Sequence, residues 1–79
     1  MNQIGGKPGA TITTYDNKTN KKIIFSFFHF LNGQIQMTIT KGNKEKIVVF
    51  SSEEDFLNRA ERSGLPSQFI QTVILASQI

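Results

Sequence analysis

The 79-residue chain is predicted to fold as one α+β domain, a four-stranded antiparallel β-meander with a C-terminal helical hairpin packed on one face. In the first part of the chain, runs of β-branched and aromatic residues alternate with short turn sequences, which is typical of strands. From Ser51 onwards the apolar residues recur at helical spacing. A chain of this length has room for a single thin core. We therefore place the domain at 10–79, after a flexible N-terminal arm at 1–9.

The arm is predicted because Gly5, Gly6, Pro8 and Gly9 crowd into it. Asn32-Gly33 is the strongest short hairpin signal, since a type I′ turn needs positive φ at both central positions. Gly42-Asn43 predicts a second tight turn. With a polar loop at 16–20, these turns separate four predicted strands, at 10–15, 21–31, 34–40 and 44–50.

Two helices are predicted after the strands. Ser51 and Ser52 can cap the first helix, with Glu54 or Asp55 three residues later completing a capping box. Gly64 suits the left-handed residue that ends this helix, and Pro66 suits the first turn of the second. The order of four strands and then two helices favours a meander with both helices on one face. The predicted buried stripes are Phe56, Leu57 and Ala60, and then Phe69, Ile70, Val73, Ile74 and Ile79.

The hairpin turns predict which side chains share a face of the sheet. With Asn32-Gly33 as a two-residue loop, Phe28 lies opposite Met37, and with Gly42-Asn43 as the next loop, Met37 lies opposite Val48. The helices are then expected to cover a core face that consists of Ile24, Phe28, Phe30, Ile35, Met37, Ile39, Val48 and Phe50.

The opposite face is the predicted partner-binding surface. Exposed contiguous apolar area usually marks an interaction site, and aromatic anchors among polar groups are typical of binding hot spots. The alternative is that the second strand is central and buried on both sides, with the N-terminal arm folded over it. The candidate contact residues are Tyr15, Phe25, Phe27, His29, Gln36 and Thr38, and Ile47 and Val49 share their face.

A lysine-rich end is predicted as well, because the first and third loops of a meander lie at the same end of the sheet. Its lysines could neutralise phosphates of a nucleic acid. The alternative is that they keep loops and edges soluble. Only Asp16 and Glu45 oppose them in the first half of the chain, and the whole chain carries a net charge of +3. The lysines are Lys18, Lys21, Lys22, Lys41, Lys44 and Lys46.

Several classes of site are excluded by composition. The absence of cysteine removes disulfides, thiolate metal sites and cysteine nucleophiles. His29 is the only histidine and has no second metal-type ligand near it in the predicted sheet, so it is expected to be a polar surface or interface residue. Glu53, Glu54 and Asp55 are consecutive on a helix, so their carboxylates diverge. We therefore expect no catalytic residues, no metal and no cofactor.

No membrane contact is expected either. No apolar run approaches the roughly 18 residues that a membrane span needs. The first residues lack the apolar core of a signal peptide. The expected compartment is the cytoplasm.

Four short segments resemble a family of small phage proteins. Thr14-Tyr15-Asp16-Asn17 resembles that family's Tyr-Glu-Asn at a strand end, and Asn32-Gly33 resembles its hairpin turn. Phe50-Ser51-Ser52-Glu53-Glu54 resembles its Phe-Asp-Ser-Thr-Glu helix entry, and Gly64-Leu65-Pro66 its Gly-Leu-Pro between helices. With the strand and helix order, the chain resembles type I-F anti-CRISPR proteins. The resemblance implies a stoichiometric inhibitor that acts through its sheet face. Tyr15 matches one of that family's binding tyrosines, whereas a second falls near the arm, where this chain has no aromatic residue.

Two hypotheses of function follow. The first is a protein-binding module, an inhibitor or adaptor of a phage or mobile element, which contacts a protein or ribonucleoprotein through the outer face. A homodimer through the same face is a variant of it. The second is a single-stranded nucleic acid-binding protein, with bases stacked on Tyr15, Phe25 and Phe27 and phosphates at the lysine-rich end. The aromatic-rich RRM motif, however, is absent.

Overall fold

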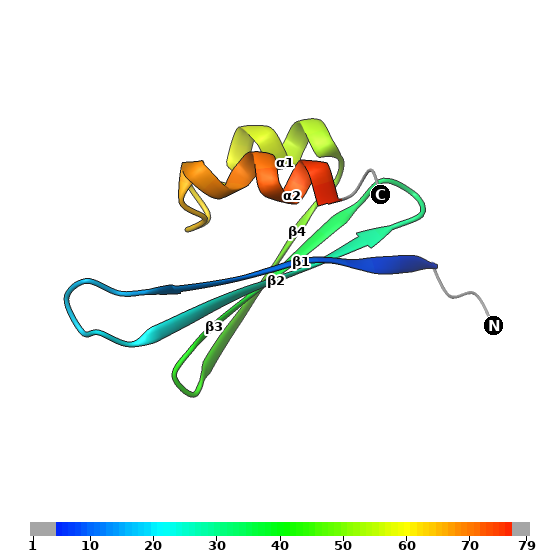
Figure 1. Ribbon diagram of the computed structural model, residues 1–79. Coiled ribbons are helices and arrows are strands. Elements are labelled where there is room, and N and C mark those ends of the chain that lie inside the picture. The colour runs from blue at the N-terminus through cyan, green and yellow to red at the C-terminus, as the bar shows by residue number, and fades with distance from the viewer. Residues whose placement is uncertain (1–4, 77–79) are drawn as a thin grey trace.

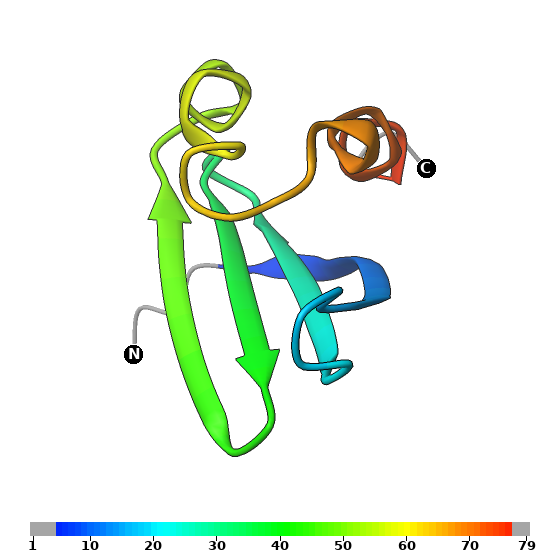
Figure 2. The same cartoon turned by 90° about the vertical axis from the view of Figure 1, so that its left-hand side faces the viewer.

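The structure, a computed structural model, describes residues 5–76. One antiparallel sheet with strand order β1-β2-β3-β4 carries two C-terminal helices on a single face, as predicted (Figure 1). Seen along the sheet, α1 lies above β4 and α2 lies above β1 (Figure 2). The elements are β1 (Gly6–Tyr15), β2 (Lys22–Phe30), β3 (Ile35–Lys41), β4 (Lys44–Phe50), α1 (Glu53–Arg59), the 3₁₀ turn η1 (Ser67–Phe69) and α2 (Ile70–Ala76).

The predicted flexible arm at 1–9 is wrong for residues 6–9, which belong to β1. Gly6 lies opposite Phe30 and Lys7 opposite His29, and the register shifts by one residue between Pro8 and Thr11. This shift is a β-bulge, which inserts an extra residue into one strand. Gly6 and Gly9 are needed here because the β2 backbone and the rings of Phe28 and His29 approach the β1 backbone closely, and that reason is not visible in the local sequence. Residues 1–4 lie outside the described residues.

The β2–β3 hairpin differs from the prediction by one residue. The Phe30 amide donates to the Gln34 carbonyl at 2.9 Å, and the Gly33 amide donates to the Phe30 carbonyl at 3.0 Å. The loop therefore has three residues, Leu31 to Gly33, and Gly33 takes a φ of 94°. A tight turn followed by a residue with positive φ is the usual three-residue hairpin. Leu31 is thus part of the turn and not of the strand.

This one-residue difference exchanges the two faces of β2, because side chains alternate along a strand. Phe27 lies opposite Met37, in the place predicted for Phe28. Phe25 and Phe27 consequently point into the core, with exposed fractions of 3% and 4%. The prediction that Ile24, Phe28 and Phe30 form the core face is wrong.

The β3–β4 hairpin agrees with the prediction. Gly42 and Asn43 form a two-residue loop closed by Lys41 and Lys44. Gly42 has a φ of 62°, whereas Asn43 has no positive φ, which is the pattern of a type II′ turn. Met37 accordingly lies opposite Val48.

Both predicted helices are present. The Ser52 hydroxyl accepts a hydrogen bond from the Asp55 amide at 3.1 Å, and the Asp55 carboxylate accepts one from the Ser51 amide at 2.9 Å. Gly64 has a φ of 117° after α1, as expected for the residue that ends a helix. Leu57, predicted to be buried, is 47% exposed. Ile79 lies outside the described residues.

The core lies between the helices and the facing side of the sheet. The Phe56 ring packs edge-on against Phe50 and Phe27, with centroid distances of 5.1 and 6.1 Å. Leu65, which joins the two helices and was not predicted to be buried, is 1% exposed. The buried apolar residues are Ile12, Phe25, Phe27, Ile35, Met37, Phe50, Phe56, Ala60, Leu65, Val73 and Ile74.

Candidate functional site

The sheet surface opposite the helices is the candidate functional site, here called the helix-free face. The register places Thr13 opposite Ile24, Phe28 opposite Gln36, and Gln36 opposite Val49 on this side. Apolar and polar side chains are therefore mixed across all four strands. The apolar members are Tyr15, Ile24, Phe28, Phe30, Ile47 and Val49, and the uncharged polar members are Thr11, Thr13, Ser26, Gln36, Thr38 and Thr40.

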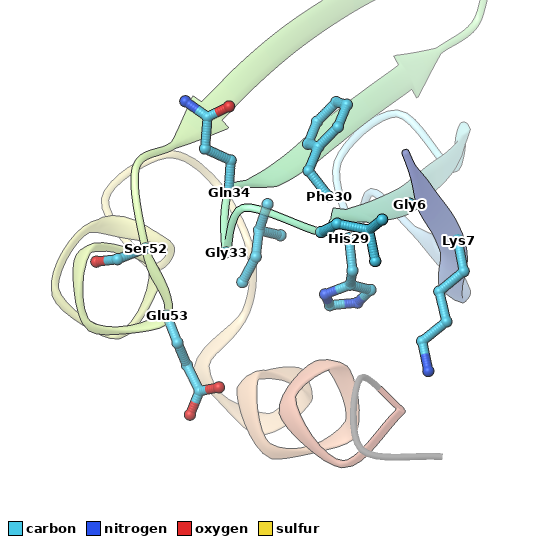
Figure 3. A pocket seen from close by; sticks show the side chains of 10 residues that line it. Gly6, Lys7, His29, Phe30, Gly33, Gln34, Ser52 and Glu53 are labelled. Carbon is cyan, nitrogen blue, oxygen red and sulfur yellow. The ribbon is translucent and has the colours of Figure 1, made fainter. Parts of the chain in front are cut away.

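An aromatic pair marks one end of the helix-free face. The Phe28 and Phe30 rings pack edge-to-face, with centroids 5.0 Å apart and an interplanar angle of 65°. Both side chains are half-buried. Figure 3 shows Phe30 leaving β2 on the side away from the helices, whereas His29 points toward them. This alternation, set by the three-residue hairpin loop, makes Phe28 and Phe30 available on the helix-free face.

The predicted contact residues divide into two groups. Tyr15, Gln36 and Thr38 lie on the helix-free face, and Tyr15 is 59% exposed. The placement of Phe25, Phe27 and His29 on this face is wrong, since all three are buried on the helix side.

Three residues of the helix-free face were assigned to the core from the sequence: Ile24, Phe28 and Phe30. The signal that could have found them is Gly33, since a glycine as third loop residue fits a three-residue loop as well as a two-residue one. The exposed β4 side chains, Ile47 at 55% and Val49 at 46%, lie on the predicted face.

The two loops of the lysine-rich end are joined by an ion pair. Lys41 Nζ lies 2.6 Å from the Asp16 carboxylate. The same carboxylate accepts hydrogen bonds from the Lys18 amide at 2.8 Å and the Thr19 amide at 3.4 Å. The bond from Lys41 and then that from the Lys18 amide lower the pKa of Asp16 to about 2. One of the six lysines is therefore neutralised within the fold.

The remaining lysines do not share one face. Lys22 pairs with Tyr15 on the helix-free side, whereas Lys46 lies opposite Ile39 on the helix side. Beside the helix-free face is a hollow of about 300 Å³, whose lining includes Lys21 and Lys22. The other lining residues are Ile24, Thr40 and Gly42. This part of the lysine-rich end adjoins Ile24 of the helix-free face.

A second hollow, of about 500 Å³, lies on the helix side near the start of β1. Figure 3 shows the His29 ring directed into it, with Lys7 on one side and Glu53 on the other. His29 is 8% exposed, and its Nε2 atom has no hydrogen-bond partner. Burial lowers the pKa of His29, and the Lys7 charge lowers it further, while the Glu53 charge acts in the opposite direction.

The described residues show no arrangement typical of a metal centre. Within residues 5–76, no three His, Asp or Glu side chains are grouped so that they could hold an ion. No helix in that part of the chain is long and apolar enough to cross a membrane.

Comparison of the chain with protein-family models, with curated proteins and with solved structures gives no match. Function is therefore inferred from the geometry of the chain itself.

Proposed function

We propose that this is a small non-enzymatic protein that binds a protein or ribonucleoprotein through its helix-free face and acts as an inhibitor or adaptor. The observation that supports the proposal is the apolar content of a sheet face that neither helix covers. Tyr15, Ile47 and Val49 are each about half exposed there, and the Phe28–Phe30 pair lies on the same face, at the end away from Tyr15. Exposed apolar side chains gathered on one face among polar residues are typical of an interaction site.

The chemistry of the face favours a protein surface as the partner. Along the central strands its polar members are uncharged Thr, Ser and Gln side chains, and Lys22 and Glu45 lie at one end. The cores of protein interfaces are similarly poor in charge and rich in aromatic residues. Phe28 and Tyr15 would be anchors of such a contact, with the threonines around them excluding water.

The anti-CRISPR resemblance indicates the partner to test first, a type I-F CRISPR surveillance complex. The purified complex would be titrated with the protein, and binding of the target DNA would be measured by gel shift. A stoichiometric inhibitor abolishes DNA binding near an equimolar ratio. If DNA binding is unchanged at a large excess of the protein, this complex is not the partner.

Variants connect the outcome to the helix-free face. The double substitution Ile47→Thr and Val49→Thr removes exposed apolar area but keeps β-branched residues in β4, and it should weaken inhibition. The matched control is Leu57→Gln with Leu75→Gln, which alters side chains of similar exposure, 47% and 59%, on the helices. Equal loss in both variants would contradict a contact through the helix-free face.

Single-stranded nucleic acid is a second candidate, favoured by the Phe28–Phe30 pair and by Lys21 and Lys22 at the hollow near the opposite end of β2. Stacked bases contribute about 1–3 kcal/mol each, and phosphate contacts make affinity fall steeply with salt. Fluorescence polarisation of labelled single strands at two salt concentrations tests this candidate. Salt-sensitive binding that is lost in the double variant Lys21→Gln and Lys22→Gln would favour single-stranded nucleic acid over a protein partner. Light scattering of the same sample shows whether the protein forms a homodimer.

A further inference from the structure

The side chain of His29 is packed against the backbone of β1. Its Nε2 atom is buried and lacks a hydrogen bond. The imidazole lies directly over Gly9, so closely that a Cβ at this position would overlap Nε2 and Cδ2. Gly9 belongs to the bulge between Pro8 and Thr11. A neutral imidazole therefore covers the point at which the two parts of β1 meet.

The part of β1 before the bulge is attached more weakly than the part after it. Pro8 has no amide hydrogen, and residues 5–8 are all exposed. The attachment includes the short pairing with residues 28–30 and a bond from the Leu31 amide to the Gly5 carbonyl at 2.7 Å. Segments with few buried contacts open at low free energy while the rest of the fold stays intact.

We propose that His29 is an acid-sensitive contact that holds residues 5–8 on β2. When neutral, the imidazole packs on Gly9. When protonated, it moves away from Gly9, further into the 500 Å³ hollow that it lines and toward the Glu53 carboxylate, and residues 5–8 detach from β2. The hollow provides the space for this movement, and Glu53 provides the opposite charge (Figure 3).

The charges around His29 favour movement of the protonated ring toward Glu53. On β1 the neighbouring ionisable group is Lys7, which disfavours a buried imidazolium, and on α1 it is Glu53, which favours one. On β3 the residue opposite is Ile35, and α2 has no ionisable side chain from Ile70 to Ala76. Since burial lowers the pKa of His29 in the packed state, protonation occurs more readily once the ring has left Gly9. Opening should therefore increase as pH falls below about 6.5, the ordinary value for histidine.

Hydrogen exchange provides the test, because two adjacent amides report on different partners. The Leu31 amide donates to Gly5, whereas the Phe30 amide donates to Gln34 in the β2–β3 hairpin. Between pH 7.5 and 5, after correction for intrinsic exchange, protection of Leu31 should fall while that of Phe30 stays constant. The fall should approach tenfold for each unit by which the measured pKa of His29 lies below 6.5.

Three variants make the result specific. His29→Gln should abolish the pH dependence at Leu31. Glu53→Gln should move it to lower pH, because the imidazolium loses its acceptor, and this variant serves if His29→Gln does not fold. Gly9→Ala should displace the His29 ring, so that protection of the Leu31 amide is already low at pH 7.5. A Leu31 protection factor that is constant with pH in the wild type, or that falls equally in His29→Gln, would overturn the proposal.

Discussion

Single side chains determine how α1 begins. Ser52 is the N-cap, and its hydroxyl accepts the Asp55 amide at 3.1 Å. Ser52→Ala leaves this amide without its partner, and such losses reduce the free energy of unfolding by about 1 kcal/mol. For a domain of this size the melting temperature should fall by about 4–8 °C. Thermal unfolding followed by circular dichroism measures the effect.

The same substitution at Ser67 is the control. Ser67 is exposed at the start of η1, where no side chain caps the helix. Ser67→Ala should change the stability by no more than about 0.5 kcal/mol. Equal effects of the two substitutions would mean that the Ser52 hydrogen bond does not stabilise α1.

The carboxyl group of Asp16 should make stability depend on acid. Its pKa is about 2 in the fold, because it accepts from the Lys41 ammonium and from loop amides, and this value is below the ordinary one of 3.8. A lowered pKa means that the unfolded chain binds the proton more readily. The stabilisation is therefore complete above about pH 4 and is lost as pH falls toward 2.

Asp16→Asn should consequently reduce the part of the acid sensitivity that lies between pH 4 and 2. Urea unfolding at several pH values measures it. Glu61→Gln removes an exposed carboxyl for which the structure gives no ion pair, and it is the matched control. If the two variants show the same pH profile, the Asp16–Lys41 pair does not form in solution.

At the scale of the elements, the β2–β3 hairpin allows a direct test of register. Deleting Leu31 leaves Asn32-Gly33 as a two-residue loop between Phe30 and Gln34, and these two residues already pair in the structure. The deletion therefore keeps Phe27 opposite Met37. Leu31 is 84% exposed, so the main loss is its hydrogen bond to Gly5, about 1 kcal/mol.

The deletion variant should therefore fold with the same faces, and NMR contacts between Phe27 and Met37 would show the register. If Leu31 instead paired with Gln34, Phe28 and Phe30 would lie in the core, and the deletion would exchange the faces of β2 and expose them. An unfolded deletion variant would thus support the two-residue loop and contradict the structure.

The two hairpins also show what local sequence can predict. Gly42-Asn43 predicted the β3–β4 register correctly, because its two-residue loop is flanked by residues that pair directly. Asn32-Gly33 did not, because the glycine fits the third position of a longer loop equally well. Residues 6–9 contain the glycines and proline of a flexible segment, yet they form a strand because ring contacts from β2 favour residues without a Cβ. The hairpin is ambiguous because the same local sequence fits two allowed turns. The strand at residues 6–9 depends on tertiary contacts, which the local sequence does not reveal.

At the scale of the whole molecule, the architecture is predictable because strand and helix periodicities change once, near Ser51. The same order of elements predicts that one face of the sheet stays free of helices. Which side chains occupy that face depends on a single loop residue, Leu31. The sequence therefore placed Tyr15, Gln36 and Thr38 correctly on this face, but Phe25, Phe27 and His29 wrongly.

The difference between the two faces has a consequence for stability. Phe27 is 4% exposed and packs on Phe56, so Phe27→Ala removes buried area and leaves a cavity, a loss of about 3–5 kcal/mol. A domain of this length has about 4–12 kcal/mol in total. Phe27→Ala should therefore remove a large part of the domain's free energy of unfolding.

Ile47→Thr and Val49→Thr, on the helix-free face, should each change stability by about 0.5 kcal/mol or less, because both side chains remain about half exposed in the fold. Urea unfolding of the three variants compares the faces directly. A folded Phe27→Ala together with an unfolded Val49→Thr would mean that the core lies on the other side of the sheet. If Phe27→Ala is strongly destabilised and the two threonine variants are not, Ile47 and Val49 contribute little to folding. Substitutions at these two positions can then test partner binding without altering the fold.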